Sequence, residues 1–402
     1  MPKVVITGIG VISPLGHGID TFFNGLITGK SGLRKITRFD ASTYPCQIAG
    51  EVDFKPEDFL EKRFIRFTSL ATQFACAAFR LGQADAGIKR FPTQTEVIFG
   101  CGVSNLEPVA DHLQKAPETS HEYSAADPLI VQRMFIGGPA SGVALLAGAR
   151  GLVTTVSTAC SSGVNALGIA FDRIKSGRVD IAIVGACDTP LNRLVHNGFC
   201  SSGHYTSNND PANQKPFDAR REKCAPGEGA SVFILESDRR ARARGARVYC
   251  EVSGFSAENE NTSELYFIDK SGTTWGRVLG LVAKGATHIN AHGISDRVVD
   301  LVEAAAIRIA MGKALKKTSV TSIKGAVGSG LAAAGGFQIA TAAKTVHTGI
   351  IPPTLRYATP DPEIGLDVPT CQRQTNPRAV IVSSHGVTGY NAAIQLRRLA
   401  HD

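Results

Sequence analysis

Short runs of β-branched and aliphatic residues alternate with longer segments rich in alanine and glycine along most of this chain. The small-residue segments Val164–Lys175 and Phe337–Val346 predict helices. The apolar runs predict strands at Val4–Thr7, Glu96–Phe99, Val153–Val156, Ile181–Val184, Val232–Leu235, Val248–Ser253, Ile289–Ala291 and Ala379–Val382. This alternation predicts an α/β fold in which sheets are flanked by helices.

The two halves of the chain repeat one pattern. Gly163 is followed by a small-residue helix that ends near Gly177 and by the strand Val179–Val184. Gly335 is followed by a similar helix that ends near Gly349, and we interpret Ile350–Pro352 as the matching strand. The repeat predicts a duplicated α/β unit with the functional site where its halves meet.

Composition narrows the class of protein. The 402 residues carry a net charge of +8, and the densest basic run, Arg239–Arg247, contains no interleaved aromatic residues. We therefore expect no nucleic-acid partner, although an acidic protein partner is compatible with the charge. No apolar run reaches membrane-spanning length, so we expect no membrane association. The nine cysteines are scattered, without zinc-type spacing, which predicts no metal, no disulfide framework and a reducing, cytoplasmic location.

Cys160 is the strongest candidate for covalent chemistry. It follows the predicted strand Val153–Val156 through a sharp turn, at the predicted start of a helix. Unpaired backbone N–H groups and the helix dipole at such a position favour the thiolate. We therefore expect a lowered pKa and the most reactive of the nine cysteines. The local pattern alone does not exclude the alternative that Cys160 is a small buried cysteine packed in a core.

Several motifs support one resemblance, and they lie in the same order as in a known family. They are Val4–Gly10 with Pro14–Gly16, Thr158–Gly163, Pro216–Asp218 with Gly227–Ala230, Asn290–Gly293 followed by Asp300 and Glu303, and Ser322–Lys324. Over essentially its full length the chain resembles the β-ketoacyl-acyl-carrier-protein synthases, the condensing enzymes of thiolase fold.

The resemblance implies an architecture and partners. The expected fold is thiolase-like, with two duplicated α/β halves in α-β-α-β-α layers. We place the first half at residues 1–245, with Cys160 and cap insertions, and the second at 246–402. Acyl carrier protein, acyl and malonyl thioesters, and a homodimer or a heterodimer with a related ketosynthase subunit are the implied partners. No cofactor is implied.

The resemblance also assigns roles. Cys160 would take an acyl group from the carrier. His292 would donate a hydrogen bond to the malonyl thioester carbonyl and so stabilise the enolate that forms there on decarboxylation. Lys324 and Glu303 would form a buried pair beside His292. The backbone N–H of Cys160 and one from the loop near Val387 would hold the tetrahedral oxyanion, with His385, Gly386 and Thr388 around them. Arg63 and Arg66 are candidates for carrier docking, and a solvated helix face explains them equally well.

Three positions depart from the family pattern. Ser329 stands where the family has a second histidine, and a serine hydroxyl is a shorter, uncharged donor. The residues after the first histidine motif are altered to Ile294–Asp296. The C-terminal loop Ser384–Asn391 lacks both family phenylalanines, and Val387 replaces the gating one. All three changes fall in the malonyl half of the expected site.

These departures leave three interpretations. The chain is a condensing enzyme of fatty-acid or type II polyketide biosynthesis, with Ser329 or His385 as the substitute donor. Alternatively it is a non-elongating acyltransferase that loads Cys160 and passes the acyl group on. The third interpretation is a chain-length-factor-like partner subunit, against which the retained Cys160 counts. We rank condensation first.

Overall fold

The computed structural model describes residues 1–115, 127–262 and 268–399. Within this part, the main strands form one 11-stranded mixed sheet, in which the short β2 (Gly16–His17) pairs beside β1. Its first-half strands are β1 (Val4–Ser13), β5 (Glu96–Cys101), β6 (Val153–Val156), β7 (Ile181–Asp188) and β8 (Gly229–Ser237). Its second-half strands are β9 (Cys250–Asn259), β10 (His288–Asn290), β11 (Ser319–Thr321), β14 (Ala379–Gly386) and β15 (Tyr390–Arg397). The predicted main strands are confirmed, several of them longer than expected.

The two halves of the sheet have the same topology. In space the first half runs β6-β5-β7-β8-β1 and the second runs β11-β10-β14-β15-β9. In both, the first three strands are parallel and the next two pairings are antiparallel. The halves meet where β1 pairs with β9, with Val5 opposite Glu251. The predicted duplication is therefore present in the fold, and its core is built from alternating strands and helices.

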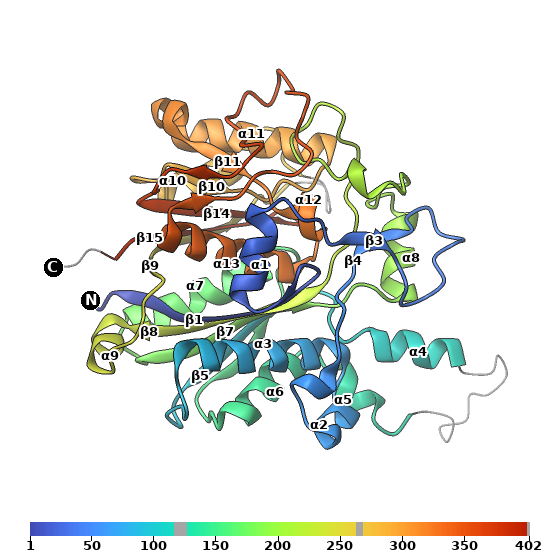
Figure 1. Ribbon diagram of the computed structural model, residues 1–402, viewed down its shortest axis with the longest axis vertical. Helices are drawn as coiled ribbons and strands as arrows, with labels where there is room; N and C mark the ends of the chain where they lie inside the picture. The colour runs from blue at the N-terminus through green and yellow to red at the C-terminus, as the bar shows by residue number, and fades with distance from the viewer. Residues whose placement is uncertain (116–126, 263–267, 400–402) are drawn as a thin grey trace.

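Helices and the two half-sheets form five layers (Figure 1). The central layer holds α7 (Ser162–Lys175) and α13 (Ala332–Thr348), which contact strands of both halves. The outer layers are α3 (Leu70–Ala86) with α6 (Gly138–Ala147) on one side, and α10 (Thr273–Leu281) with α11 (Arg297–Met311) on the other. Separate apolar clusters fill the interfaces between the layers. This is the α-β-α-β-α arrangement of the thiolase fold.

The two central helices approach closely because glycine lines their contact. A Cβ atom on Gly163 would lie 2.8 Å from the carbonyl oxygen of Ala332, and one on Gly335 would lie 3.2 Å from the backbone nitrogen of Val164. Side chains there would push the helices apart. The glycines thus bring the N-termini of α7 and α13, and the loops that precede them, to one place.

The remaining elements cover the edges of these layers. They are α1 (Ile19–Ile27), α2 (Lys62–Phe67), α4 (Glu107–Lys115), α5 (Ile130–Met134), α8 (Arg193–Ser201), α9 (Asp238–Ala243) and α12 (Lys324–Val327), the pair β3 (Leu33–Lys35) with β4 (Ile48–Gly50), and the pair β12 (Ile350–Ile351) with β13 (Arg373–Gln374). Short 3-10 helices lie at Pro56–Asp58, Pro211–Asn213 and Gly312–Lys317. None of the helices in the described ranges has the length and apolar character needed to cross a membrane.

One predicted strand has a different place. We matched Ile350–Pro352 to the strand that follows the first central helix, but within the described ranges Ile350 and Ile351 pair only with Arg373 and Gln374, in a small separate sheet. The strand that occupies the matching position is β14, which begins at Ala379. The prediction was wrong because a two-residue apolar run contains no information about its partner strand.

Candidate active site

Cys160 lies in a tight turn between β6 and α7. Ala159, just before it, has a left-handed φ of 51°, which turns the chain sharply. The Ser162 hydroxyl holds this turn, because it accepts from the Thr158 backbone N–H at 2.8 Å and donates to the Ala159 carbonyl at 2.6 Å. The Ser384 hydroxyl donates to the Cys160 carbonyl at 3.2 Å. The turn therefore presents the thiol at the carboxyl end of β6, next to the loop that follows β14.

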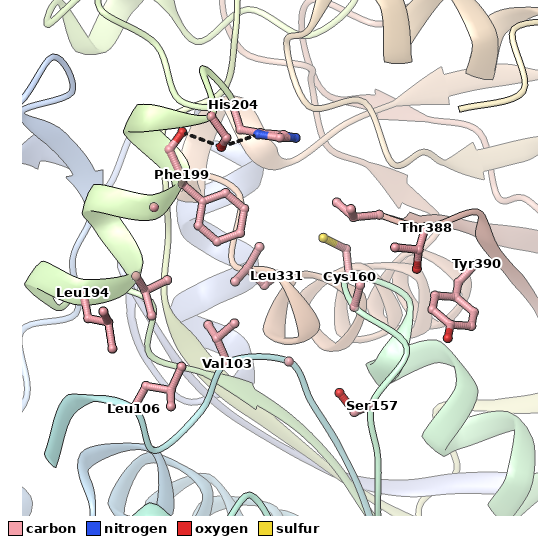
Figure 2. Close-up of a pocket in the computed structure, with 16 residues that line it drawn as sticks. Val103, Leu106, Ser157, Cys160, Leu194, Phe199, His204, Leu331, Thr388 and Tyr390 are labelled. Carbon is pink, nitrogen blue, oxygen red and sulfur yellow. Dashed lines mark hydrogen bonds between the residues drawn. The ribbon is translucent and has the colours of Figure 1, made fainter. Parts of the chain in front are cut away.

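The thiol faces a large apolar cavity of about 1010 Å³. Figure 2 shows the sulfur of Cys160 directed into this cavity, toward the ring of Phe199. Its lining is mostly aliphatic and aromatic and includes Val103, Leu106, Leu194, Phe199, Leu331 and Tyr390. A cavity of this size and character suits a hydrocarbon chain attached to the sulfur.

A second, smaller cavity of about 460 Å³ shares Cys160 with the first. Its lining is more polar and includes His292, Ser329, His385, Lys223 and Asp296. Val387 and Thr388 line both cavities. Cys160 therefore stands between an apolar chamber and a chamber lined by His204, His292 and His385, so one molecule bound in each would meet at the sulfur.

The expected lowering of the Cys160 pKa is wrong. Burial raises the pKa of the thiol to about 11, while Lys324 acts to lower it and Asp188 acts to raise it further. Hydrogen bonds from the backbone N–H groups of Cys160 and Val387 favour the thiolate but do not offset the burial. The helix also begins later than expected, at Ser162, so the sulfur is outside its first turn.

The raised pKa makes a prediction about alkylation. In the free protein, the rate at which iodoacetamide modifies Cys160 is expected to keep rising with pH from about 7 to about 10, because the reactive thiolate fraction keeps growing. Peptide mass mapping of Cys160 at each pH measures this rate, and the C160A variant gives the background. A plateau reached below about pH 8 would show that the thiolate is already dominant and would contradict the burial argument.

His292 and Lys324 form a directed pair beside the second cavity. The Lys324 ammonium lies 3.1 Å from Nδ1 of His292 and also donates to the His292 backbone carbonyl. Burial lowers the pKa of Lys324 to about 8 and, together with the Lys324 charge, holds the pKa of His292 well below its usual range. The imidazole is thus neutral, and because Nδ1 accepts from Lys324, Nε2 holds the proton. His292 is therefore a hydrogen-bond donor into the cavity.

Glu303 acts differently from expectation. Its carboxylate accepts from the backbone N–H groups of His292 and Gly293, both at 2.7 Å, and from the Ser383 hydroxyl at 2.6 Å. Glu303 and Lys324 are both buried, as predicted, but among the described residues no ion pair within 4.0 Å joins the carboxylate to the ammonium. The two groups influence each other only through space, where Glu303 favours the ammonium form of Lys324. Glu303 instead fixes the backbone that carries His292.

The other predicted site residues are brought together, except for the two arginines. Ser329, His385, Val387 and Thr388 line the second cavity, and Gly386 packs so tightly on the turn that a Cβ atom there would lie 2.6 Å from the Thr158 carbonyl oxygen. Arg63 and Arg66 lie apart from this group, exposed on α2. Within the described ranges no group of three or more histidine, cysteine or acidic side chains is arranged to hold a metal ion.

The basic run Arg239–Arg247 does not form a free positive surface. Every arginine in it lies within 4.0 Å of a carboxylate, and the partners are Asp180, Glu236, Asp238 and Asp85. Charges paired in this way are available to an external polyanion only if those contacts break. The run is therefore better explained as a structural network around β8.

Two buried residues support the site and were not predicted. Asp188, at the end of β7, accepts from the Ala332 N–H at the start of α13 at 2.9 Å and from the Val103 N–H at 2.8 Å. Gln338, on α13, donates to the carbonyls of Ala291 at 2.7 Å and Ser383 at 2.9 Å. Both hold the loops around the cavities together. Only their polar character within apolar segments distinguished them in the sequence.

Comparison with known proteins defines the family. Residues 1–241 match the family model of the beta-ketoacyl synthase N-terminal domain, and residues 249–358 match that of the C-terminal domain. The chain belongs to the β-ketoacyl synthase family. This is a family of acyl-transferring condensing enzymes, and it is the family that the motifs predicted.

Relatives come from two branches. The chain is 34% identical to the tetracenomycin polyketide synthase ketoacyl synthase alpha subunit of Streptomyces glaucescens, over 98% of this chain and 97% of that protein. It is 32% identical to the 3-oxoacyl-[acyl-carrier-protein] synthase 2 of Synechocystis, with 98% of each chain covered. Among solved structures, the ishigamide ketosynthase/chain length factor superposes with a TM-score of 0.91 at 30% identity, over 99% of this chain and 100% of that chain. A type II PKS ketosynthase solved in complex with its acyl-carrier protein gives the same TM-score at 25% identity, over 100% of each chain.

Proposed function

We propose that this chain condenses an acyl group held on Cys160 with a malonyl thioester by decarboxylative Claisen chemistry. The observation that carries the proposal is the position of Cys160 between the apolar chamber and the chamber of His292. The sequence relatives, a polyketide ketoacyl synthase and a 3-oxoacyl-[acyl-carrier-protein] synthase, support the same reaction class.

In the first step Cys160 takes the acyl group. Its thiolate attacks the carrier thioester carbonyl, the carbon–sulfur bond to the carrier breaks, and the carrier thiolate leaves with the proton that Cys160 gave up. The acyl chain then occupies the apolar chamber. The N–H groups of Cys160 and Val387, which point at the sulfur, are positioned to hold the oxyanion of the tetrahedral intermediate.

In the second step a malonyl thioester enters the smaller chamber. Its carboxylate leaves as carbon dioxide, and the electron pair of the broken carbon–carbon bond forms an enolate whose oxygen accepts from Nε2–H of His292. The enolate carbon attacks the acyl carbon on Cys160, and the thiolate of Cys160 leaves. Lys324 keeps His292 in the donor tautomer throughout.

One observation favours a second candidate, acyl transfer without elongation. Ser329 is the residue on the second chamber where the family has a histidine, and its backbone is hydrogen-bonded while its hydroxyl makes no hydrogen bond within the described part of the chain. Loss of a donor slows decarboxylation more than loading. A chain-length-factor-like role is the remaining alternative, since one structural relative is a ketosynthase/chain length factor. The intact turn at Cys160 favours the catalytic role.

Reconstitution tests the proposal. The purified chain, alone or with any ketosynthase-like subunit encoded beside it, is incubated with acyl-carrier and malonyl-carrier thioesters. The expected product is a carrier-bound β-ketoacyl chain longer by the malonyl-derived unit, detected by mass spectrometry of the carrier. Transfer of the unextended acyl group to another nucleophile would support the non-elongating acyltransferase. Absence of both products would contradict both enzymatic interpretations.

The carrier is the proposed source of the acyl group, and a cytoplasmic location goes with it. One structural relative was solved with its acyl-carrier protein. Arg63 and Arg66 are exposed on α2, where they are available to the acidic surface of a carrier, and this docking role stays a prediction.

We also propose that the chain acts as a dimer, with itself or with a related ketosynthase subunit. Strand β6 is an edge strand and pairs, among the described residues, only with β5. Exposed apolar side chains lie on β6 itself and on α5, α6 and the flanking loops: Val131, Met134, Phe135, Ile136, Leu145, Leu152 and Val153. An unpaired edge beside such a face is typical of a protein interface.

The proposed dimer predicts that one charged side chain introduced into the interface will separate the subunits. Replacing Leu145, whose side chain is 72% exposed, with arginine is expected to convert a two-chain assembly into single chains, because a buried unpaired charge destabilises an interface. Sedimentation equilibrium measures the assembly mass. L281R, at the 67% exposed Leu281 of the opposite outer layer, is the matched control and is expected to stay assembled. The proposal would be contradicted if the parent protein sedimented as a single chain even after co-expression with any ketosynthase-like subunit encoded beside it.

A further inference from the structure

A second imidazole, His385, lies beside His292 on the malonyl chamber. The ring centroids are 6.2 Å apart with an interplanar angle of 76°. The indole of Trp275 holds both rings, since it stacks on His385 at 4.9 Å and meets His292 edge-on at 6.0 Å. His385 is nearly buried, and it lines the same chamber as Cys160.

The hydrogen bonds around His385 fix where its protons are. Nδ2 of Asn391 donates to Glu260 at 3.2 Å, so the amide oxygen of Asn391 is the atom that faces His385. Nδ1 of His385 donates to this oxygen at 3.0 Å. The remaining ring nitrogen, Nε2, makes no hydrogen bond to any residue in the described ranges. In the neutral ring Nε2 is therefore a bare acceptor, and it becomes a donor only when the ring is protonated.

The surroundings include a partner for that protonated ring. An oxygen of Glu260, whose side chain is fully buried, lies 3.5 Å from Nδ1 of His385. The other oxygen of Glu260 accepts from the Asp269 N–H at 2.8 Å, which holds the carboxylate in place. A buried carboxylate at this distance favours an imidazolium. No other described side chain of this chamber places a carboxylate on a histidine ring.

We propose that His385, as an imidazolium paired with Glu260, is the second hydrogen-bond donor to the malonyl thioester carbonyl. It thereby supplies the second imidazole donor that the family has at the position of Ser329. During decarboxylation the carbon–carbon bond breaks, carbon dioxide leaves, and the negative charge that develops on the thioester oxygen is shared by Nε2–H of His292 and Nε2–H of His385. No proton is transferred. Asn391 and Glu260 are positioning residues, because they act through His385. The inference rests on the proposed condensation.

The balance of nearby charges sets a pH dependence. Burial lowers the pKa of His385 below its usual range, and the hydrogen bond to Asn391 and the charge of Glu260 oppose the burial without offsetting it. Three other titratable groups lie nearby: Lys324 behind His292, Glu303 at Ser383, and the Cys160 thiol on the chamber. The Lys324 ammonium opposes protonation of His385, and the Glu303 carboxylate supports it. Since the ring is neutral above its pKa, decarboxylation is expected to rise as the pH falls below neutrality.

The test compares three variants by malonyl-thioester decarboxylation and by acyl loading of Cys160 over about pH 5 to pH 8. H385F removes the donor and is expected to lower decarboxylation roughly 100-fold at the acid end and to abolish the acid rise. H385Q supplies an uncharged donor and is expected to restore much of the activity with no acid rise. E260Q is expected to shift the rise in decarboxylation rate to lower pH without changing the maximal rate reached at acid pH. Loading of Cys160 is expected to stay within a few-fold of the parent in all three.

The outcomes separate this inference from the proposed function. If the parent protein decarboxylates malonyl thioester and H385F does so equally well with the same pH profile, His385 is not the donor and the condensing function stands. If H385Q and H385F lose activity and loading together, the effect is structural and the inference is overturned. If the parent loads Cys160 but releases no carbon dioxide at any pH, the condensing function and the inference both fail.

Discussion

Replacing Cys160 with alanine is expected to abolish acyl loading and every later step. The thiol is the group that faces the apolar chamber, and its side chain takes no part in the hydrogen bonds that hold the turn, which come from Ser162 and Ser384. The variant is therefore expected to fold normally while its acylation falls to background. Mass spectrometry of the intact protein after incubation with an acyl-carrier thioester measures this loss.

A matched control separates loss of the nucleophile from loss of any cysteine. Cys371 is exposed and lines neither chamber. C371A is expected to load acyl groups at the rate of the parent protein. Acylation that persists in C160A, or disappears in C371A, would mean that the nucleophile is elsewhere.

Replacing His292 with alanine is expected to lower malonyl decarboxylation by roughly 100- to 1000-fold, because the donor to the enolate oxygen is lost. Acyl loading of Cys160 is expected to change by only a few-fold, since loading uses the Cys160 and Val387 N–H groups rather than the imidazole. Carbon dioxide release and intact-protein mass, measured on the same preparation, give the two rates.

The control for this variant is H347A, because His347 is exposed near the end of α13 and lines neither chamber. It is expected to match the parent protein in both rates. Equal losses of loading and decarboxylation in H292A would show that His292 supports the fold rather than the enolate, and unchanged decarboxylation would remove it from the chemistry.

Local pattern predicted the strands and the turn at Cys160 because these depend on residues close in sequence. The run Val153–Val156 and the small residues after Gly163 determine a strand, a turn and a helix whatever lies around them. The repeat of the two halves was visible for the same reason. What failed was the pairing of Ile350 and Ile351, since the choice between a main sheet and a small separate pair is made by segments far along the chain.

The electrostatics of the site could not be predicted in the same way. The pKa of Cys160 is raised by burial, and that burial comes from the C-terminal loop at Val387, from Leu331 and from other segments that are distant in sequence. A helix-start pattern contains no information about them. The same holds for Glu303, which acts on the Lys324 charge through space while its oxygens accept from backbone N–H groups and from Ser383.

The central claim is that Cys160 loads an acyl group and that a malonyl unit then loses carbon dioxide to extend it. A single-turnover experiment tests it most directly: acyl-loaded protein is mixed with malonyl-carrier thioester, and loss of the acyl group from Cys160, carbon dioxide release and β-ketoacyl product are followed in one sample. We predict that the three occur together and in equal amounts. A stable acyl group on Cys160 with no carbon dioxide released would contradict the account.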